Sequence, residues 1–488
     1  MPIDSFPLIS VLLLFITATL MPLIKKEKFA KGITLAAFGV CFSMFIITLN
    51  YVLSKGGYYY RIGHFSSPIG IEFYVGLIEC IMGILFTFVA IMVLWYSIYN
   101  IHHDISKDKI NLYYLLVNIL VGSLLGIVFS NDIFNVFVFI EIGNLASCGI
   151  VVIKDKKENI KAGMKYLIMS CLGSGLVLMG IAFLYSITGH LNMTYMHEVL
   201  AQNYMDYSKI ITIVLGLFTV GLGVKSAMFP LHTWLPDAHS NAPTSSSALL
   251  SSLVLKGYVW FFIKVLYRIF GKEIIVNFPI LNVVLLLGSL GMILGSIFAI
   301  YQKNIKRVIA YSTVAQMGYI FFALGLGELG LAIAVFHIIG HAVTKAALFL
   351  CAGSIIQSTG FKNLEDLRGI GREMPYTLGL FFVASLSMIG IPVLPGFISK
   401  WYLALASIET NRIMLIGVIL ISSLLNAVYY FPIAINGYFG EENLINKVNK
   451  GKEKPFKQLL PIIILVLAMF FIGIKSRDII DLIKSGLV

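Results

Sequence analysis

Long apolar stretches recur along the whole chain, and short polar segments separate them. Most stretches are about 18–25 residues long, which is enough for a helix to cross a bilayer core of roughly 30 Å. The pattern predicts an all-α polytopic membrane protein with about fourteen transmembrane helices. The predicted spans centre on residues 5–23, 30–53, 73–100, 110–129, 131–153, 163–187, 208–228, 241–267, 279–301, 305–326, 329–356, 375–407, 413–438 and 456–474.

The composition supports this interpretation. Of the 488 residues, 58% are hydrophobic and 12% are charged, whereas soluble domains carry about 45–50% and about 25%. Soluble and fibrous proteins are therefore excluded. The first apolar stretch has no basic segment before it and no small-residue cleavage site after it, so we expect a retained span rather than a signal peptide.

The net charge of +12 is unevenly distributed. Lysine and arginine concentrate in alternate loops, with KKEKFAK, KDKKENIK, KNIKR and KVNKGKEKPFK as the main clusters. Cytoplasmic loops of membrane proteins carry such an excess. We therefore expect residues 154–161 and 447–457 to face the cytoplasm and both termini to lie outside. This distribution also argues against nucleic acid as a partner.

Metal and cofactor motifs are not evident in the chain. The five cysteines fall inside predicted spans without CxxC spacing, which argues against a disulfide framework, a zinc site or an iron–sulfur site. No HExxH pattern and no haem, flavin or nucleotide motif is present. We expect no cofactor and no metal in this chain. A non-catalytic role within an oxidoreductase complex stays open.

Two predicted spans are interrupted by prolines beside a lysine. Span seven continues into VKSAMFPLHTWLP, and span twelve reads MIGIPVLPGFISKWYLALA. Proline breaks a helix, and broken backbone is tolerated in a membrane only where it lines a polar cavity. Paired broken helices at matching places point to an inverted-repeat transporter. The predicted organisation is three N-terminal helices in 1–108, five-helix repeats in 109–270 and 271–440, and a last loop, helix and tail in 441–488.

Several ionisable residues lie inside the predicted spans. Each lone charge at mid-membrane costs about 2.5–3.5 kcal/mol, so such residues normally face a polar interior and have a function. The two histidines and the lysine of span eleven follow at steps of four, which places them on one helix face. We predict a polar file through the bundle that is formed by Glu141, Lys225, Lys256, His337, His341, Lys345 and Lys400.

Other intramembrane charges favour structural interpretations. Lys264 and Lys165 lie near span ends, where a lysine usually extends its ammonium to the membrane surface. Glu79, near the outer end of span three, is equally a candidate cation site or an interface group. The histidine pair lacks the further ligands that a metal site would need.

At these residues the sequence resembles a known family. Glu141 and the segments VKSAMFPLHTWLPDAHSNAPTSSSALLSSLVLKGYVW, KRVIAYSTVAQMGYI and SLSMIGIPVLPGFISKWYLALA are similar to an antiporter-like subunit of the complex I superfamily. The D-type subunit of Mrp cation/proton antiporters and the equivalent subunit of membrane-bound hydrogenases are the most similar. The resemblance implies two inverted five-helix repeats, a prokaryotic cytoplasmic membrane and residence among other membrane subunits of a multisubunit complex.

The resemblance also implies roles for individual residues. Glu141 matches the glutamate of span five, Lys225 the lysine of broken span seven, and Lys256 the connecting lysine of span eight. Lys400 matches the terminal lysine of broken span twelve, where some relatives have glutamate. The histidines of span eleven also match family positions.

Two classes of function remain for the chain. The leading hypothesis is a proton-translocating subunit, in which either Na+/H+ exchange or a redox partner drives transport. The alternative is a stand-alone secondary transporter of a small solute. Burial favours a neutral amine and a nearby carboxylate favours an ammonium, so movement of Glu141 relative to Lys225 would load or release a proton. The remaining residues of the file would relay it to Lys400.

Overall fold

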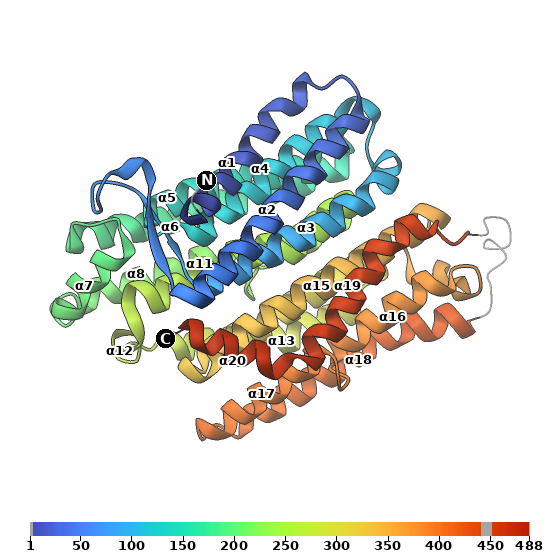
Figure 1. Cartoon of the computed structure of the whole chain (residues 1–488). Coiled ribbons are helices and arrows are strands. Elements are labelled where there is room, and N and C mark those ends of the chain that lie inside the picture. The colour runs from blue at the N-terminus through green and yellow to red at the C-terminus, as the bar shows by residue number, and fades with distance from the viewer. Residues whose placement is uncertain (1–2, 441–450, 488) are drawn as a thin grey trace.

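A computed structural model describes residues 3–440 and 451–487 as a bundle of long helices that run roughly along one axis (Figure 1). The N-terminal part contains α1 (Phe6–Leu20), α2 (Glu27–Lys55) and α3 (Leu77–Asp104). There follow α4 (Ile110–Phe129), α5 (Ile133–Val152), α6 (Lys157–Thr188), α7 (Met193–Asn203), α8 (Ser208–Lys225), α9 (Leu235–Asn241), α10 (Thr244–Leu249), α11 (Leu255–Ile263) and α12 (Gly271–Ile275). The last part contains α13 (Ile280–Ile300), α14 (Ile305–Gly325), α15 (Glu328–Thr359), α16 (Pro375–Ile389), α17 (Pro395–Glu409), α18 (Met414–Phe439), α19 (Phe456–Ile474) and α20 (Ser476–Leu487).

The helices account for the predicted membrane spans. Among the described residues, 13 helices are long and apolar enough to cross a membrane. The further predicted span, 375–407, is divided between α16 and α17, each of 15 residues. A helix of that length extends about 22 Å, which is shorter than the bilayer core of roughly 30 Å. The prediction of an all-α polytopic protein with a broken twelfth span is confirmed.

One predicted loop forms a small sheet. Strands β1 (Tyr58–Arg61) and β2 (Glu72–Val75) pair antiparallel, with Tyr58 opposite Val75 and Arg61 opposite Glu72. The sequence analysis predicted no strands in this segment. The segment is rich in tyrosine, and aromatic residues favour strands.

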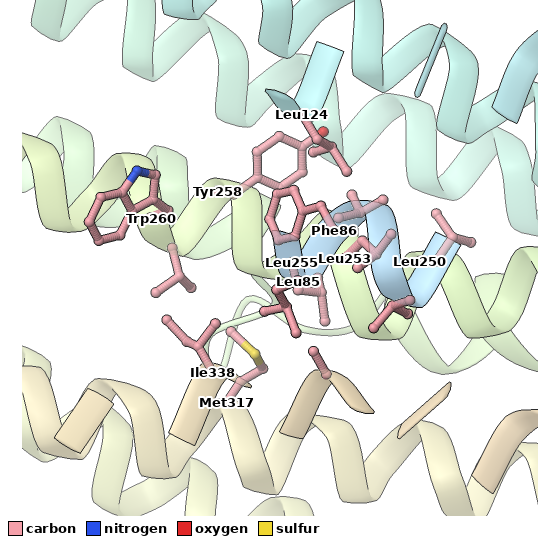
Figure 2. Close-up of a cluster of buried hydrophobic side chains, with 14 of the residues drawn as sticks. Leu85, Phe86, Leu124, Leu250, Leu253, Leu255, Tyr258, Trp260, Met317 and Ile338 are labelled. Carbon is pink, nitrogen blue, oxygen red and sulfur yellow. The ribbon is translucent and has the colours of Figure 1, made fainter. Parts of the chain in front are cut away.

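The centre of the bundle is formed by the Thr244–Ile275 span, which contains α11, and by α15. The most apolar part of the Thr244–Ile275 span and that of Glu328–Thr359 are fully buried. Figure 2 shows that side chains from several helices meet there. They include Phe86 of α3, Leu124 of α4, Leu255 and Tyr258 of α11, Met317 of α14 and Ile338 of α15. This apolar packing brings α11 between the two predicted repeats.

The loops that follow odd-numbered predicted spans meet at one end of the bundle. Lys154 forms an ion pair with Asp104 at 2.7 Å, and the Thr244 amide donates to the same carboxylate at 2.8 Å. Lys306 joins them through a hydrogen bond to the Ala242 carbonyl. These are the loops in which the lysine and arginine clusters lie. That this end faces the cytoplasm stays a prediction, and residues 447–450 of the second predicted cytoplasmic segment lie outside the described residues.

Candidate functional site

Lys225 is the last residue of α8, where the helix is interrupted. Ala227 has a φ of 54°, and the chain turns through a short loop before α9 begins. The interruption leaves carbonyl groups of α8 without helical partners, and the Trp234 indole donates to one of them, that of Val224, at 2.8 Å. The Lys225 ammonium reaches across to α6 and donates to the Ser170 carbonyl and hydroxyl, both at 3.2 Å.

Glu141 approaches Lys225 from α5. Its Oε1 atom lies 3.9 Å from Lys225 Nζ. The same oxygen accepts a hydrogen bond from the Asn144 amide at 3.1 Å and a short one from the Ser174 hydroxyl of α6. The Lys225 side chain is fully buried, whereas the Glu141 side chain is 36% exposed. The pair therefore joins the interior of the bundle to its outer surface.

Asn144 and Tyr258 connect this pair to the centre of the bundle. The Asn144 side-chain oxygen accepts from the Tyr258 hydroxyl at 2.9 Å and from the Ser170 hydroxyl at 2.8 Å. Lys225 Nζ lies 5.5 Å from the centroid of the Tyr258 ring, which is within the range of a cation–π interaction. Because Tyr258 belongs to α11, one connected polar network extends from Glu141 to the central helix.

Lys256 lies on α11, two residues after a π-helical segment, η5 (Leu250–Val254). Its side chain is fully buried, and its ammonium donates to the Ser251 carbonyl. Among residues 3–440 and 451–487, no carboxylate forms an ion pair with it. π-Helical turns often occur at functional sites because they alter the local backbone hydrogen bonding.

The histidines of α15 stack on one another as their spacing predicts. The rings of His337 and His341 are 5.8 Å apart at an interplanar angle of 26°. His337 Nδ1 lies 2.8 Å from the Ser399 hydroxyl of α17. Both ring nitrogens of His341 are buried without a hydrogen-bond partner among the described residues. Buried polar groups of this kind are normally satisfied by ordered water.

Lys345 lies one turn beyond His341 on the same helix. Its ammonium donates to the Ile309 carbonyl at 3.0 Å and forms a short hydrogen bond with the Ser312 hydroxyl, both on α14. The Tyr430 hydroxyl of α18 lies 3.5 Å away. Lys345 is thus surrounded by neutral oxygens, as Lys256 is.

Lys400 lies beside the break between α16 and α17. Its ammonium donates to the Met388 and Ile389 carbonyls at 2.9 and 2.7 Å. The break leaves these carbonyls at the end of α16 without helical partners. The Lys400 nitrogen also lies 4.9 Å from the centroid of the Tyr319 ring, and that ring is 5.7 Å from His337. The Tyr319 ring therefore contacts both Lys400 and His337 of the histidine pair.

The sequence analysis missed His239, which lies near the middle of this arrangement. The residue is fully buried on α9 between the rings of Trp234 and Phe349, at 6.4 and 5.7 Å. Neither ring nitrogen has a hydrogen-bond partner among the described residues. The residue was overlooked because its segment, LPDAHS, contains one proline, follows another and has the composition of a loop. The imidazole interacts electrostatically with three buried lysines: Lys256, Lys306 and Lys345.

Lys306 was counted with the basic loop cluster KNIKR, but it does not lie in a solvated loop. The side chain is buried, and its ammonium donates to the Ala242 carbonyl at 2.9 Å and to the Ser247 hydroxyl at 3.2 Å. The basic cluster KNIKR suggested a solvated loop. Instead α14 begins at Ile305, so that this lysine points into the bundle behind the α9–α10 connection.

The interpretation of Lys264 as an anchor at the membrane surface was also wrong. Lys264 is buried, and its ammonium donates to the carbonyls of Ile127, Val128 and Ser130. These groups lie at the end of α4, where the last carbonyls of a helix lack partners. The lysine therefore caps α4 from a neighbouring helix.

Lys165 lies at the rim of the bundle as the sequence suggested, but it is paired. Its ammonium lies 2.7 Å from Asp237 Oδ2, and its side chain is 42% exposed. Asp237 also contacts the Arg307 guanidinium at 3.2 Å. The carboxylate of α9 thus ties α6 to α14 at the end of the bundle that carries the basic loops.

Glu79 lies away from the polar file. It is buried near the start of α3 and lies 3.6 Å from the Arg268 guanidinium, which stacks 3.7 Å from the centroid of the Tyr74 ring. In the part of the chain that the structure describes, no three histidine, cysteine or carboxylate side chains cluster closely enough to hold a metal ion. The candidate site consists of ionisable side chains and hydroxyl groups.

Residues 130–426 match the model of one protein family, which is described as NADH:quinone oxidoreductase/Mrp antiporter, TM. A relative from Desulforudis audaxviator, named NADH-quinone oxidoreductase subunit N, is 32% identical over 97% of this chain and 96% of its own length. The chain belongs to this family. The D subunit of a Na(+)/H(+) antiporter from Alkalihalophilus pseudofirmus is 29% identical over 86% of this chain and 83% of its own length.

Two solved structures have the same fold as this member of the family. A chain of the archaeal membrane-bound sulfane sulfur reductase superposes with a TM-score of 0.88 at 26% identity, covering 99% of this chain and 96% of that chain. A chain of the Mrp complex from Dietzia sp. superposes with a TM-score of 0.89 at 20% identity, with 99% and 97% coverage. The resemblance inferred from the motifs is confirmed, and the protein is an antiporter-like multi-span membrane protein.

Proposed function

We propose that this chain is the proton-translocating subunit of a multisubunit membrane complex. The observation that carries the proposal is a succession of protonatable side chains, all buried except Glu141, that begins at the surface of α5 and ends beside the break of α16 and α17. Hydroxyl and aromatic side chains connect the members at its two ends. The members are Glu141, Lys225, Lys256, His239, Lys345, His341, His337 and Lys400.

The first step takes place between Glu141 and Lys225. At an effective dielectric of about 20, two charges about 4 Å apart interact by about 4 kcal/mol, which corresponds to about three pKa units. Burial favours the neutral amine, and the carboxylate favours the ammonium. Withdrawal of Glu141 therefore releases a proton from Lys225, and its return reloads the lysine.

The middle of the path lies between Lys256 and the histidines. Lys256 and Lys345 both rest on neutral oxygens without a carboxylate partner among the described residues. A lysine in such surroundings gives up its proton more readily than a paired one. His239 and His341 have free ring nitrogens, which accept and donate through bound water. A proton thus passes from the first repeat to the second.

Lys400 ends the path in the second repeat. Its ammonium is held by the two carbonyls that the helix break exposes. The break supplies acceptors for the charged form, and His337 lies one aromatic ring away. Lys400 exchanges its proton with the water on the far side of the membrane.

The path divides between two five-helix repeats, 109–270 and 271–440, which follow the N-terminal helices of 1–108 and precede 441–488. Similar helix pairs support this division. In the first repeat α4 packs on α5 and α6 on α8, and in the second α13 packs on α14 and α15 on α17. Each repeat also has one broken helix that carries a lysine at the break.

Other membrane subunits form the partners of this chain. Glu141 is partly exposed on a membrane-spanning helix, and a carboxylate facing lipid is costly. A neighbouring subunit that covers α5 removes that cost and also provides the means to move Glu141. The names of the relatives include both an Na(+)/H(+) antiporter and a quinone oxidoreductase. The partner subunits therefore supply the driving reaction, either Na+ exchange or redox chemistry. Glu79, which is paired with Arg268, serves an interface rather than the path.

The test is proton flux by the native complex. The complex is purified through this chain, its subunits are identified, and it is reconstituted into vesicles with a pH-sensitive dye inside. An imposed Na+ gradient drives flux if the partners are antiporter subunits, and an electron donor drives it if they are redox subunits. Lys256→Met should abolish flux while leaving the subunit composition unchanged. Wild-type flux in that variant would overturn the proposal.

A further inference from the structure

A groove on the outer surface of the bundle lies between α16 and the start of α19. These two helices pack against each other (Figure 1). Its volume is about 720 Å³, which falls in the range of roughly 300–1,000 Å³ found for ligand sites. Pro375, Tyr376, Gly379 and Leu380 line it from α16, and Glu453, Lys454, Phe456, Leu459 and Ile463 line it from the other side. It plays no part in the polar path.

The groove is amphipathic along its length. Deeper in the membrane its walls are Gly379, Leu380, Leu459 and Ile463, none of which carries a polar side chain. Its mouth is at the end of the bundle where Ser358 accepts a hydrogen bond from the Lys452 amide. This is the end at which the basic loops lie.

The mouth of the groove carries an excess of positive charge. The Glu453 carboxylate is already used to cap α16, since it accepts from the Tyr376 and Thr377 amides at 2.9 and 3.2 Å. The Lys454 ammonium has no ion pair or hydrogen bond to any residue in 3–440 or 451–487. Partial burial lowers the pKa of Lys454, although the nearby Glu453 acts to raise it. Lys452 and Lys457 are exposed on either side.

Two aromatic side chains lie at the mouth of the groove, near the Lys454 ammonium. Tyr376 is 70% exposed and Phe456 is 65% exposed, one on each side of the groove. Aromatic residues concentrate where the headgroups meet the hydrocarbon. The mouth is therefore at headgroup depth, and the apolar walls lie at the depth of the acyl chains.

We propose that this groove binds one anionic phospholipid, with the phosphate against Lys454 and an acyl chain between α16 and α19. Basic sites between transmembrane helices on the cytoplasmic side bind anionic headgroups. The phosphate of such a lipid pairs with the Lys454 ammonium. Its acyl chain lies against the apolar walls of the groove. A helix of a neighbouring subunit would fit the groove equally well only if it carried an acidic residue at the depth of Lys454.

Photo-crosslinking of lipids to the assembled complex tests this proposal. The complex is reconstituted with a phosphatidylglycerol or a phosphatidylcholine that carries a diazirine on one acyl chain, and the adducts are mapped by mass spectrometry. We expect the phosphatidylglycerol probe to label the α16 and α19 walls at least fivefold more than the phosphatidylcholine probe. Equal labelling by the two probes would overturn the headgroup assignment.

Two substitutions with matched controls locate the site. Lys454→Gln should lower labelling by phosphatidylglycerol at least fivefold, whereas Lys161→Gln, an exposed lysine at the same end of the bundle, should leave it unchanged. Gly379→Leu should exclude the acyl chain from the groove. Gly417→Leu places the same side chain on α18, where the added Cβ meets nothing within 4 Å, and should have no effect.

The competing occupant is a helix of a neighbouring subunit. Leu459→Cys provides a crosslinking position inside the groove for that case. A crosslink from this position to another subunit, together with no lipid adduct in the groove, would overturn the proposal. Proton flux is measured in the same samples, so that loss of the lipid site is distinguished from loss of transport.

Discussion

Lys225 and Glu141 approach within 3.9 Å of each other, yet the lysine side chain is fully buried and the glutamate side chain is 36% exposed. The two charges thus belong to different environments. The lysine is held by α6 inside the bundle, whereas the carboxylate is held by Ser174 and Asn144 near its surface. In the proposed mechanism, a partner subunit that contacts α5 moves the carboxylate while the lysine keeps its position in the bundle.

The double mutant Glu141→Gln/Lys225→Met distinguishes a proton switch from a structural ion pair. We expect it to fold and assemble but to carry no proton flux, because neither proton carrier remains. Removal of one member of a purely structural buried pair costs about 3–5 kcal/mol, and removal of both would then restore function. Flux is measured in vesicles and normalised to assembled complex.

The single variant Lys225→Arg serves as the companion measurement. Arginine stays protonated at any working pH, so it preserves the charge but cannot release the proton. It should be inactive while assembling normally. Recovered flux in the double mutant, or an active arginine variant, would show that the two charges only balance each other.

Lys400→Ala should abolish transport and leave assembly intact. The substitution removes the last proton carrier and leaves the Met388 and Ile389 carbonyls to bound water. Lys400→Glu should retain partial transport, because a carboxyl group also carries a proton and donates one hydrogen bond when protonated. The measurement is proton flux per assembled complex. An alanine variant with wild-type flux would mean that the path does not end at this lysine.

His239→Phe should fold normally and lose most of its flux. The phenylalanine ring fits between Trp234 and Phe349, so the packing survives, but the ring carries no proton. We expect at least a tenfold lower flux with an unchanged melting temperature. His190→Phe, on a loop at the opposite end of the bundle, is the control. Unchanged flux in the His239 variant would remove this residue from the path.

Lys264→Met should destabilise the protein without stopping transport. The variant removes the ammonium that satisfies three carbonyls at the end of α4, and loss of hydrogen bonds to a charged group costs about 1.5–3 kcal/mol. The melting temperature of the purified complex should fall by several degrees. Lys209→Met, at an exposed position, should leave it unchanged. Loss of flux at an unchanged melting temperature would assign Lys264 to the path instead.

The orientation of the chain is tested by cysteine labelling. In a background with Cys171→Ser, which removes an exposed native thiol, Lys157→Cys and Lys452→Cys should react with an impermeant reagent only in inside-out vesicles. Lys209→Cys, at the opposite end of the bundle, should react only in right-side-out vesicles. The reverse pattern would invert the predicted topology.

The sequence by itself determined the class of the protein and most of its spans, and it marked the lysines that we propose for the path. Span length and composition are set by the thickness and polarity of the bilayer, so the pattern of apolar stretches was sufficient. A charge such as Lys225 or Lys256 stands out inside an apolar stretch for the same reason. The prolines beside Lys400 revealed the broken helix because proline has a strong local effect on the backbone.

Only the tertiary structure decided what each charge contacts. Lys264 resembles a surface anchor in the sequence and is a buried cap on α4, and Lys306 resembles a loop charge and points into the bundle. The sequence pattern did not mark His239 as a candidate, because the segment around it has the composition of a loop. The partners of these side chains lie on helices that are distant in sequence. Helix packing brings them together, and the packing depends on contacts that no local pattern records.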